Sequence, residues 1–383
     1  MPDLLLTLWL ACSGGATTDS DAIESRDSGS GSGTDEICNS TVGVTAPLES
    51  CRPEHPCEAT GDGSILDEPS TAPACVTTNT DRTTHDDGPP QQSIDADGVT
   101  RSWCATSSED TRRPLVIWFH GAGGSADHVY DYTSLRDKAS DWIWADGSRG
   151  FHLISVQGRN LHWPTADARD MSHHDIYHRD LASPSGNRDV ELADELIDAW
   201  VDSGQADPAR IYVMGWSNGG FFAQLYGAAR HQTPTPGGNR VAAAAVFSAA
   251  DPFNDTQADD GLACQLDPYP DVTVPIHLTS RSCDLIACDQ DQADAFLEDD
   301  YLVAPGAIVG PWSSWLSERL GSGHVWQLVD AYGETDESCT SPTWCPLWVA
   351  SLNHVRWPDG VADGSGLDQE EAMLAFLEAH GGR

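Results

Sequence analysis

A serine between two glycines has the clearest chemical potential in this chain. Residues 215–219 read Gly-Trp-Ser-Asn-Gly, which fits the pattern G-x-S-x-G, and they lie between an apolar run at 211–214 and a segment with helical spacing. A tight turn from strand to helix leaves no room for side chains beside the serine, so glycines flank it. The pattern predicts that the Ser217 hydroxyl stands clear of the sheet as a nucleophile for acyl transfer.

A second glycine-rich stretch could stabilise the charge that such a reaction creates. Residues 120–124 read His-Gly-Ala-Gly-Gly and directly follow an apolar run at 115–119. Acyl transfer places negative charge on the carbonyl oxygen, and preorganised backbone N–H groups stabilise it. We therefore assign the N–H groups of Ala122 and Asn218 to an oxyanion hole. Alone, the stretch would indicate only a flexible loop.

The acid of a serine triad is expected after the nucleophile, because the order in this arrangement is serine, acid, histidine. Asp284 follows an apolar run at 274–279, two expected strands beyond that of the nucleophile. Asp251 follows the preceding run at 241–247 and is the alternative. Strand order favours Asp284.

His354 is the histidine best placed to act as the base. It follows an expected strand at 347–352 and precedes an expected helix at 368–380. His324 precedes another apolar run and His380 ends the last helix, so both are less well placed. The base would take the proton of the serine hydroxyl, while the acid fixes its tautomer and orientation.

Strands and helices alternate from about residue 93 to the C-terminus. This alternation predicts an α/β fold, a mainly parallel sheet with helices on both faces. The expected strands are 99–104, 114–119, 151–156, 210–214, 241–247, 274–279 and 347–352, and the expected helices are 125–144, 190–201, 217–230 and 368–380.

Six stretches, taken in order, resemble one known family. They are Arg101-Ser102-Trp103, residues 114–124, Asn187-Arg188-Asp189-Val190, residues 207–213, the serine motif, and His354-Val355-Arg356-Trp357-Pro358. Together they look like the polyhydroxybutyrate depolymerase and feruloyl esterase group of secreted α/β-hydrolases. The last stretch has one residue more than the His-x-Trp-Pro of that family, and Asn353 stands where a glycine is common. The resemblance implies the α/β-hydrolase fold and extracellular hydrolysis of polyesters or of acyl groups on plant polysaccharides.

The N-terminal part predicts export. An apolar run at 4–11 ends before Cys12 and resembles a bacterial lipoprotein signal, although no basic residue precedes it. We divide the chain into a signal-like segment (1–12), a disordered linker (13–36), a Cys-rich loop segment (37–90) and an α/β-hydrolase domain (91–383). We expect a secreted or cell-surface protein, with a lipid on Cys12 as one form of anchor.

The cysteine content indicates the redox environment of the protein, and the net charge excludes some classes of binding partner. Ten of the eleven cysteines follow Cys12, and this even number favours a disulfide framework. The sequence contains no Cys-x-x-Cys pair, so the cysteine spacing does not indicate a zinc site. Sixty acidic against twenty basic residues give a net charge of −40, which excludes nucleic acid and anionic membrane surfaces as partners. The acidic surface serves solubility or adaptation to salt, and the sequence leaves both open.

A histidine cluster is the remaining candidate for a site. His174 and His178 would share one face of a helix, with His173 beside them, but the segment lacks the glutamate of a zinc protease motif. We expect a polar insertion that shapes the acyl pocket together with Trp163, and no metal.

We therefore predict a serine carboxylic-ester hydrolase that needs no cofactor and acts on a small or polymeric ester. Aromatic content favours phenolic or acetylated polysaccharide substrates over a polyester. A serine peptidase on the same fold and a non-catalytic surface binding protein are the alternatives.

Overall fold

The computed structural model describes thirteen segments of the chain. They are residues 70–108, 111–162, 170–176, 178–179, 186–231, 240–249, 251–255, 264–265, 269–281, 284, 305–329, 352–361 and 368–381. The expected signal segment with Cys12, the linker, residues 37–69 and Trp163 lie outside the described residues. Among the described residues, no helix is both long and apolar enough to cross a membrane.

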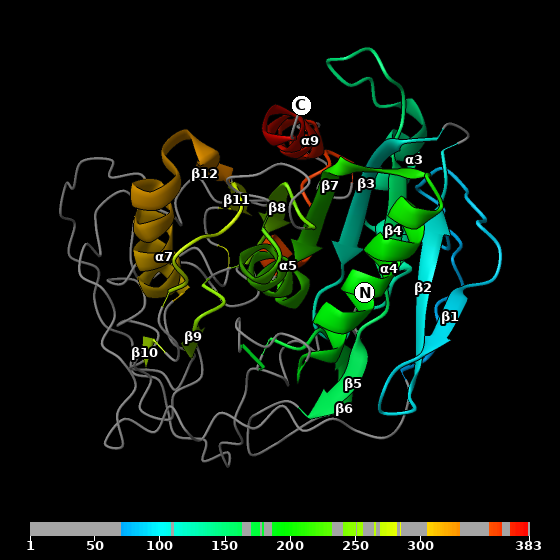
Figure 1. Cartoon of the computed structure of the whole chain (residues 1–383), viewed down its shortest axis with the longest axis horizontal. Helices are drawn as coiled ribbons and strands as arrows, with labels where there is room; N and C mark the ends of the chain where they lie inside the picture. Colours follow the sequence, from blue (N-terminus) through cyan, green and yellow to red (C-terminus); the bar gives the residue numbers. More distant parts are fainter. Residues whose placement is uncertain are drawn as a thin grey trace, which may run out of the picture.

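An eight-stranded sheet forms the centre of the molecule, in the order β1-β2-β4-β3-β7-β8-β11-β12 (Figure 1). Its strands are β1 (Gln91–Ile94), β2 (Thr100–Thr106), β3 (Arg113–Phe119), β4 (His152–Val156), β7 (Ala206–Trp216), β8 (Ala243–Phe247), β11 (Ile276–Arg281) and β12 (His324–Val329). The β1–β2 and β2–β4 pairs are antiparallel, and every pair from β4 to β12 is parallel. The predicted, mainly parallel α/β fold is confirmed.

The central strands are buried on both faces, as their continuous apolar runs predict. Alternate residues of β3 point to opposite faces: Leu115, Ile117 and Phe119 join one core cluster, and Val116 and Trp118 join the other. Helices cover both clusters. Residues of α4 (Arg188–Asp202), α5 (Asn218–Ala229) and α7 (Pro305–Leu320) lie in the first cluster. Residues of α2 (His128–Asp131), α3 (Leu135–Asp141) and α9 (Gln369–His380) lie in the second.

Small elements complete the described structure. Two antiparallel pairs lie outside the large sheet: β5 (Arg159–His162) with β6 (Asp170–His173), and β9 (Asn254–Asp255) with β10 (Cys264–Gln265). A single 3₁₀ turn, η3 (Gly321–Gly323), joins α7 to β12. Of these elements, the β5–β6 pair lies nearest to the chemistry described below.

The helix expected at 125–144 is instead two short helices, α2 and α3. Side chains replace the helical hydrogen bonds at the break. The Thr133 hydroxyl donates to Val129 O and accepts from the N–H of Leu135, while the N–H of Ser134 donates to the Glu370 carboxylate. Helical spacing alone could not show these bonds, because one of them joins residues 236 positions apart.

The sequence predicts a strand at 347–352, whereas the strand that follows β11 in the sheet is β12, which was not predicted. Residues 347–351 lie outside the described residues, and Leu352 is already part of a helical turn at 352–355. The neighbour of β11 is β12, whose sequence His-Val-Trp-Gln-Leu-Val mixes polar and apolar residues at the edge of the sheet. An edge strand buries less surface, so its pattern is weaker than that of the central strands.

Residues 70–90 are mostly irregular and pack on α2. The Asp127 carboxylate accepts the N–H groups of Ala74 and Cys75 at 2.7–3.0 Å. A disulfide joins Cys75 to Cys104 in β2. This bond supports the expectation of an oxidised cysteine framework.

Candidate active site

Ser217 lies in the tight turn between β7 and α5. Its φ of 53° and ψ of −123° are rarely adopted by residues other than glycine. A Cβ added to Gly215 would lie 2.2 Å from Gly219 O, and one added to Gly219 would lie 2.1 Å from Phe119 O. Only glycine fits at either position, which is the steric reason for the G-x-S-x-G pattern.

The structure brings the three predicted triad residues together. His354 Nε2 lies 2.8 Å from Ser217 Oγ, and His354 Nδ1 lies 3.1 Å from Asp284 Oδ1. The Asp284 side chain is completely buried. A carboxylate beside Nδ1 favours the tautomer with its proton on Nδ1, which leaves the Nε2 lone pair facing the serine hydroxyl. The arrangement can therefore deprotonate Ser217.

A second serine, which the sequence analysis missed, completes the acid side of the site. Ser248 Oγ donates to Asp284 Oδ2 at 2.6 Å and lies 2.5 Å from His354 Nδ1, from which it can accept. Ser248 is completely buried and also has a positive φ of 54°. Its only signal in the sequence is its place directly after the strand beside that of Ser217, a common place for any serine.

The two serines have different geometries toward His354. Ser248 shares Nδ1 with the acid, whereas Ser217 faces Nε2, on the opposite side of the ring. A nucleophile must give its proton to the nitrogen that does not carry the bond to the acid. Ser217 meets this requirement. The contacts of Ser248 are those of a residue that orients the acid and the base.

The glycine-rich loop lies beside the nucleophile. A Cβ added to Gly121 would be 3.3 Å from Ser217 Cβ. No hydrogen bond between described residues uses the N–H of Ala122 or of Asn218, so both are available to a carbonyl oxygen bound at Ser217. The loop thus supplies a place for the expected oxyanion hole.

His120 fixes the start of this loop. Its Nδ1–H donates to Gly121 O at 2.7 Å, and its Nε2 accepts the N–H of Gly158 at 2.9 Å. Complete burial lowers the pKa of His120 well below its usual value, so the ring is neutral and has a single tautomer.

Part of the chain is similar in sequence to known esterases. Residues 104–293 match the profile of the phospholipase/carboxylesterase family. The chain has the α/β-hydrolase fold, and this part of it is similar to carboxylesterases. A protein of Nocardia uniformis subsp. tsuyamanensis, NocK, named as an esterase, is 26% identical over 112 residues. That match covers 29% of this chain and 27% of NocK, about a quarter of its length.

Two solved esterases align with this chain at low sequence identity and low structural similarity. An esterase of Pyrobaculum calidifontis is 14% identical, with a TM-score of 0.41 over 74% of this chain and 84% of that one. A Bacillus cereus carboxylesterase is 15% identical, with a TM-score of 0.34 over 66% and 94%. The closer resemblance to polyhydroxybutyrate depolymerases and feruloyl esterases stays a prediction.

Asp251 belongs to a separate group of contacts. Its carboxyl oxygens accept the N–H of Phe253 at 2.8 Å and the hydroxyl of Tyr269 at 2.7 Å. Complete burial raises the pKa of Asp251 to about 7. Of the two aspartates considered from the sequence, the structure brings Asp284 to His354.

The loop that carries His354 is held from two sides. Trp216 Nε1 donates to His354 O at 2.8 Å, and Trp357 Nε1 donates to Glu370 Oε1 at 2.6 Å. The second oxygen of the buried Glu370 carboxylate accepts from Lys138, the only lysine of the chain, at 2.7 Å. The base is therefore anchored to both β7 and α9.

The histidine cluster forms no helix in its described residues. His173 ends β6, and the described residues after it, 174–176 and 178–179, are not helical. His174 is buried, and burial lowers its pKa well below the usual value, whereas His178 is exposed and lies 2.6 Å from Asp175 Oδ2. His174 and His178 thus share no helical face.

Variants of the two aspartates distinguish a catalytic role from a structural one. We expect Asp284→Asn to lower kcat about 10³- to 10⁴-fold, because the amide stabilises the wrong tautomer of His354. Asp251→Asn should leave kcat within about threefold, because its contacts do not reach His354. Hydrolysis of a p-nitrophenyl ester measures both, and equal losses in the two variants would contradict the assignment.

Ser248→Ala tests the role of the second serine. Removing its hydroxyl takes away the hydrogen bond to Asp284 Oδ2, and the loss of a bond to a charged group costs a factor of about 10 to 100 in kcat. Ser280→Ala is the matched control, since Ser280 is equally buried and its hydroxyl has no hydrogen-bond partner among the described residues. Complete inactivation by Ser248→Ala, with Ser217→Ala still active, would identify Ser248 as the nucleophile.

Proposed function

We propose that this α/β-hydrolase cleaves carboxylic esters through a covalent acyl-enzyme on Ser217. One observation carries the proposal: Ser217 Oγ lies 2.8 Å from His354 Nε2, while Asp284 and Ser248 bind the opposite ring nitrogen. The family match over residues 104–293 supports the same class of reaction.

The first half of the reaction forms the acyl-enzyme. Ser217 Oγ attacks the ester carbonyl carbon while His354 Nε2 takes its proton. The negative charge that develops on the carbonyl oxygen is met by the N–H groups of Ala122 and Asn218. The tetrahedral intermediate collapses, the bond to the alcohol oxygen breaks, and His354 gives the proton to the departing alcohol.

The second half restores the enzyme. A water molecule attacks the acyl carbon and gives a proton to His354. The bond to Ser217 Oγ then breaks, the carboxylic acid leaves, and His354 returns the proton to the serine. Asp284 and Ser248 stabilise the imidazolium that forms in each half. Each turnover consumes one ester and one water and needs no cofactor.

For the substrate we propose acyl esters of phenolic or polysaccharide type. The resemblance of the sequence to feruloyl esterases supports this class. Aromatic side chains could line a groove for such substrates: Trp312 is buried in the core, whereas Trp315 and Trp326 are partly exposed. Polyesters are the alternative within the same chemistry.

The central experiment is release of p-nitrophenol from acetate and butyrate esters, in low and high salt. Wild type should be active, and Ser217→Ala should lose about 10⁴- to 10⁶-fold in kcat. Ser280→Ala should behave like wild type. Activity on peptide anilides without activity on esters would show a peptidase, and inactivity of folded wild type on both would favour a binding protein.

We also propose that the protein acts outside the cytoplasm. The Cys75–Cys104 disulfide supports this, because such bonds persist in oxidising compartments. The chain recovered from the medium or the cell surface should carry this bond in non-reducing peptide maps. Recovery from the cytoplasm alone, with both thiols free, would contradict the proposal.

A further inference from the structure

A short segment connects the two parts of the oxyanion hole. Residues 172–175, here called the bridging segment, run from the end of β6 past the nucleophile turn. The N–H of Gly123, next to Ala122, donates to Ser172 O at 2.7 Å. The side chain of Asn218 accepts from the N–H of His174 at 2.7 Å and donates to His174 O at 3.1 Å. One piece of backbone thus binds beside both assigned donors.

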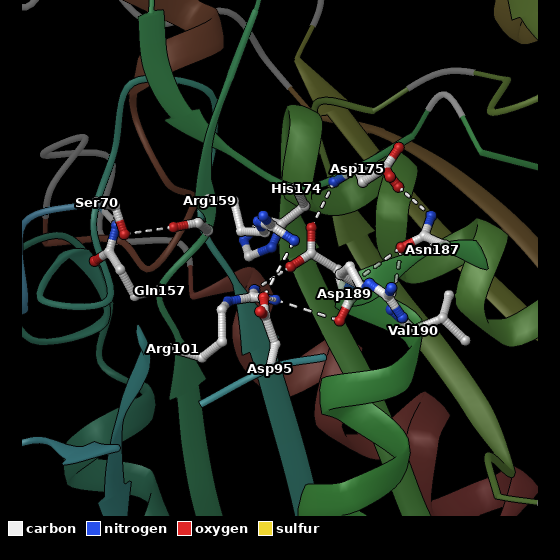
Figure 2. Close-up of polar contacts among 12 residues, drawn as sticks. Ser70, Asp95, Arg101, Gln157, Arg159, His174, Asp175, Asn187, Asp189 and Val190 are labelled. Carbon is white, nitrogen blue, oxygen red and sulfur yellow. Dashed lines mark hydrogen bonds and ion pairs between the residues drawn. The ribbon is translucent and has the colours of Figure 1, made fainter. Parts of the chain in front are cut away.

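A buried polar network holds the bridging segment in place (Figure 2). Asp189 Oδ2 accepts the N–H of Asp175 at 2.6 Å, and Asn187 Nδ2 donates to Asp175 O at 2.7 Å. The other oxygen of Asp189 pairs with Arg101 of β2. Asn187 Oδ1 also caps α4, accepting the N–H groups of Asp189 and Val190. The segment is therefore tied to both the sheet and the start of α4.

The opposite side of the bridging segment rests on the residues after β4. Gln157 Nε2 donates to Ser172 Oγ at 2.6 Å. A Cβ added to Gly158 would lie 2.7 Å from the backbone of His173, so the two chains touch closely. The N–H of Gly158 is the group that fixes His120, at the start of the glycine-rich loop. The loop and the bridging segment share this support.

Stability alone does not explain the buried ion pair. The Arg101 and Asp189 side chains are each 1% exposed. Burying two charges costs desolvation energy, and well-packed apolar residues often stabilise such a site equally well. An apolar residue at 189 could not accept the N–H of Asp175. The Arg101–Asp189 pair therefore serves to hold the backbone N–H of Asp175 in one position.

We propose that Asn218, through its side chain, and Asp189 are positioning residues that set the distance between the two N–H groups of the oxyanion hole. Asp189 acts by accepting the N–H of Asp175, and Asn218 acts through its two hydrogen bonds to the backbone of His174. Neither side chain touches the reacting atoms, and the role deepens the proposed function on which it rests.

Two variants with matched controls test the role. Asn218→Ala keeps the backbone N–H but loses both side-chain hydrogen bonds to His174. Asp189→Asn loses the charge that pairs with Arg101 and orients the acceptor of the Asp175 N–H. Gln224→Ala on α5 and Asp194→Asn on α4 are the controls; Gln224 bonds Gly220 and Trp312, and Asp194 pairs with Arg230. The readouts are kcat and KM for p-nitrophenyl acetate and the inhibition constant of an alkyl trifluoromethyl ketone. That ketone forms a hemiketal on Ser217 whose oxyanion occupies the hole.

We expect both variants to lower kcat about 10- to 100-fold with KM within about threefold, and to weaken ketone binding in parallel. The controls should stay within about threefold of wild type. Unchanged kcat in Asn218→Ala, or equal losses in variants and controls, would overturn the role. Asn218→Ala decides if Asp189→Asn does not fold, which thermal unfolding monitors. Wild type inactive on esters and unable to bind the ketone would instead refute the proposed function.

Discussion

The close approach of Gly219 to the end of β3 is the constraint on which the site depends. With an added Cβ only 2.1 Å from Phe119 O, no other residue fits, and β3, β7 and α5 are locked together at one point. Phe119 and Gly215 are partners in register, so the glycine-rich loop and Ser217 leave the sheet side by side. The unusual backbone of Ser217 costs about 1–3 kcal/mol, which the packing of the buried parts of β3 and β7 must offset.

The same edge of the sheet gathers the rest of the site. Strand β8 pairs Phe247 with Trp216 of β7 and with Thr279 of β11, so the residues after these strands lie close together. Ser217, Ser248 and Asp284 all follow the carboxyl ends of parallel strands, where α/β proteins place their ligands. His354 arrives from a distant part of the chain, and Trp216 and the Lys138–Glu370 pair hold its loop. His354 does not follow a strand of the described sheet, so its position depends on these contacts from Trp216 and Glu370.

The sequence predicted what depends on local pattern. Buried central strands such as β3 and β8 can be predicted from their unbroken apolar runs. The serine motif predicts the position of Ser217, because only glycines fit on either side of the turn. It missed features set by tertiary contact: the edge strand β12, the break between α2 and α3, and Ser248, whose role appears only when β8 lies beside β7 and β11. The spacing of His174 and His178 would suit a helix, but Asn218 and Asp189 accept the N–H groups of His174 and Asp175, and the described residues 174–176 are not helical.

The most direct test of the account is to locate a covalent adduct. A diethyl p-nitrophenyl phosphate would react with the activated oxygen, with p-nitrophenolate leaving and a diethyl phosphoryl group remaining on the protein. Peptide mapping by mass spectrometry should place this group on Ser217, and Ser217→Ala and His354→Ala should both prevent its formation. An adduct on Ser248, or labelling that persists without His354, would contradict the geometry on which the account rests.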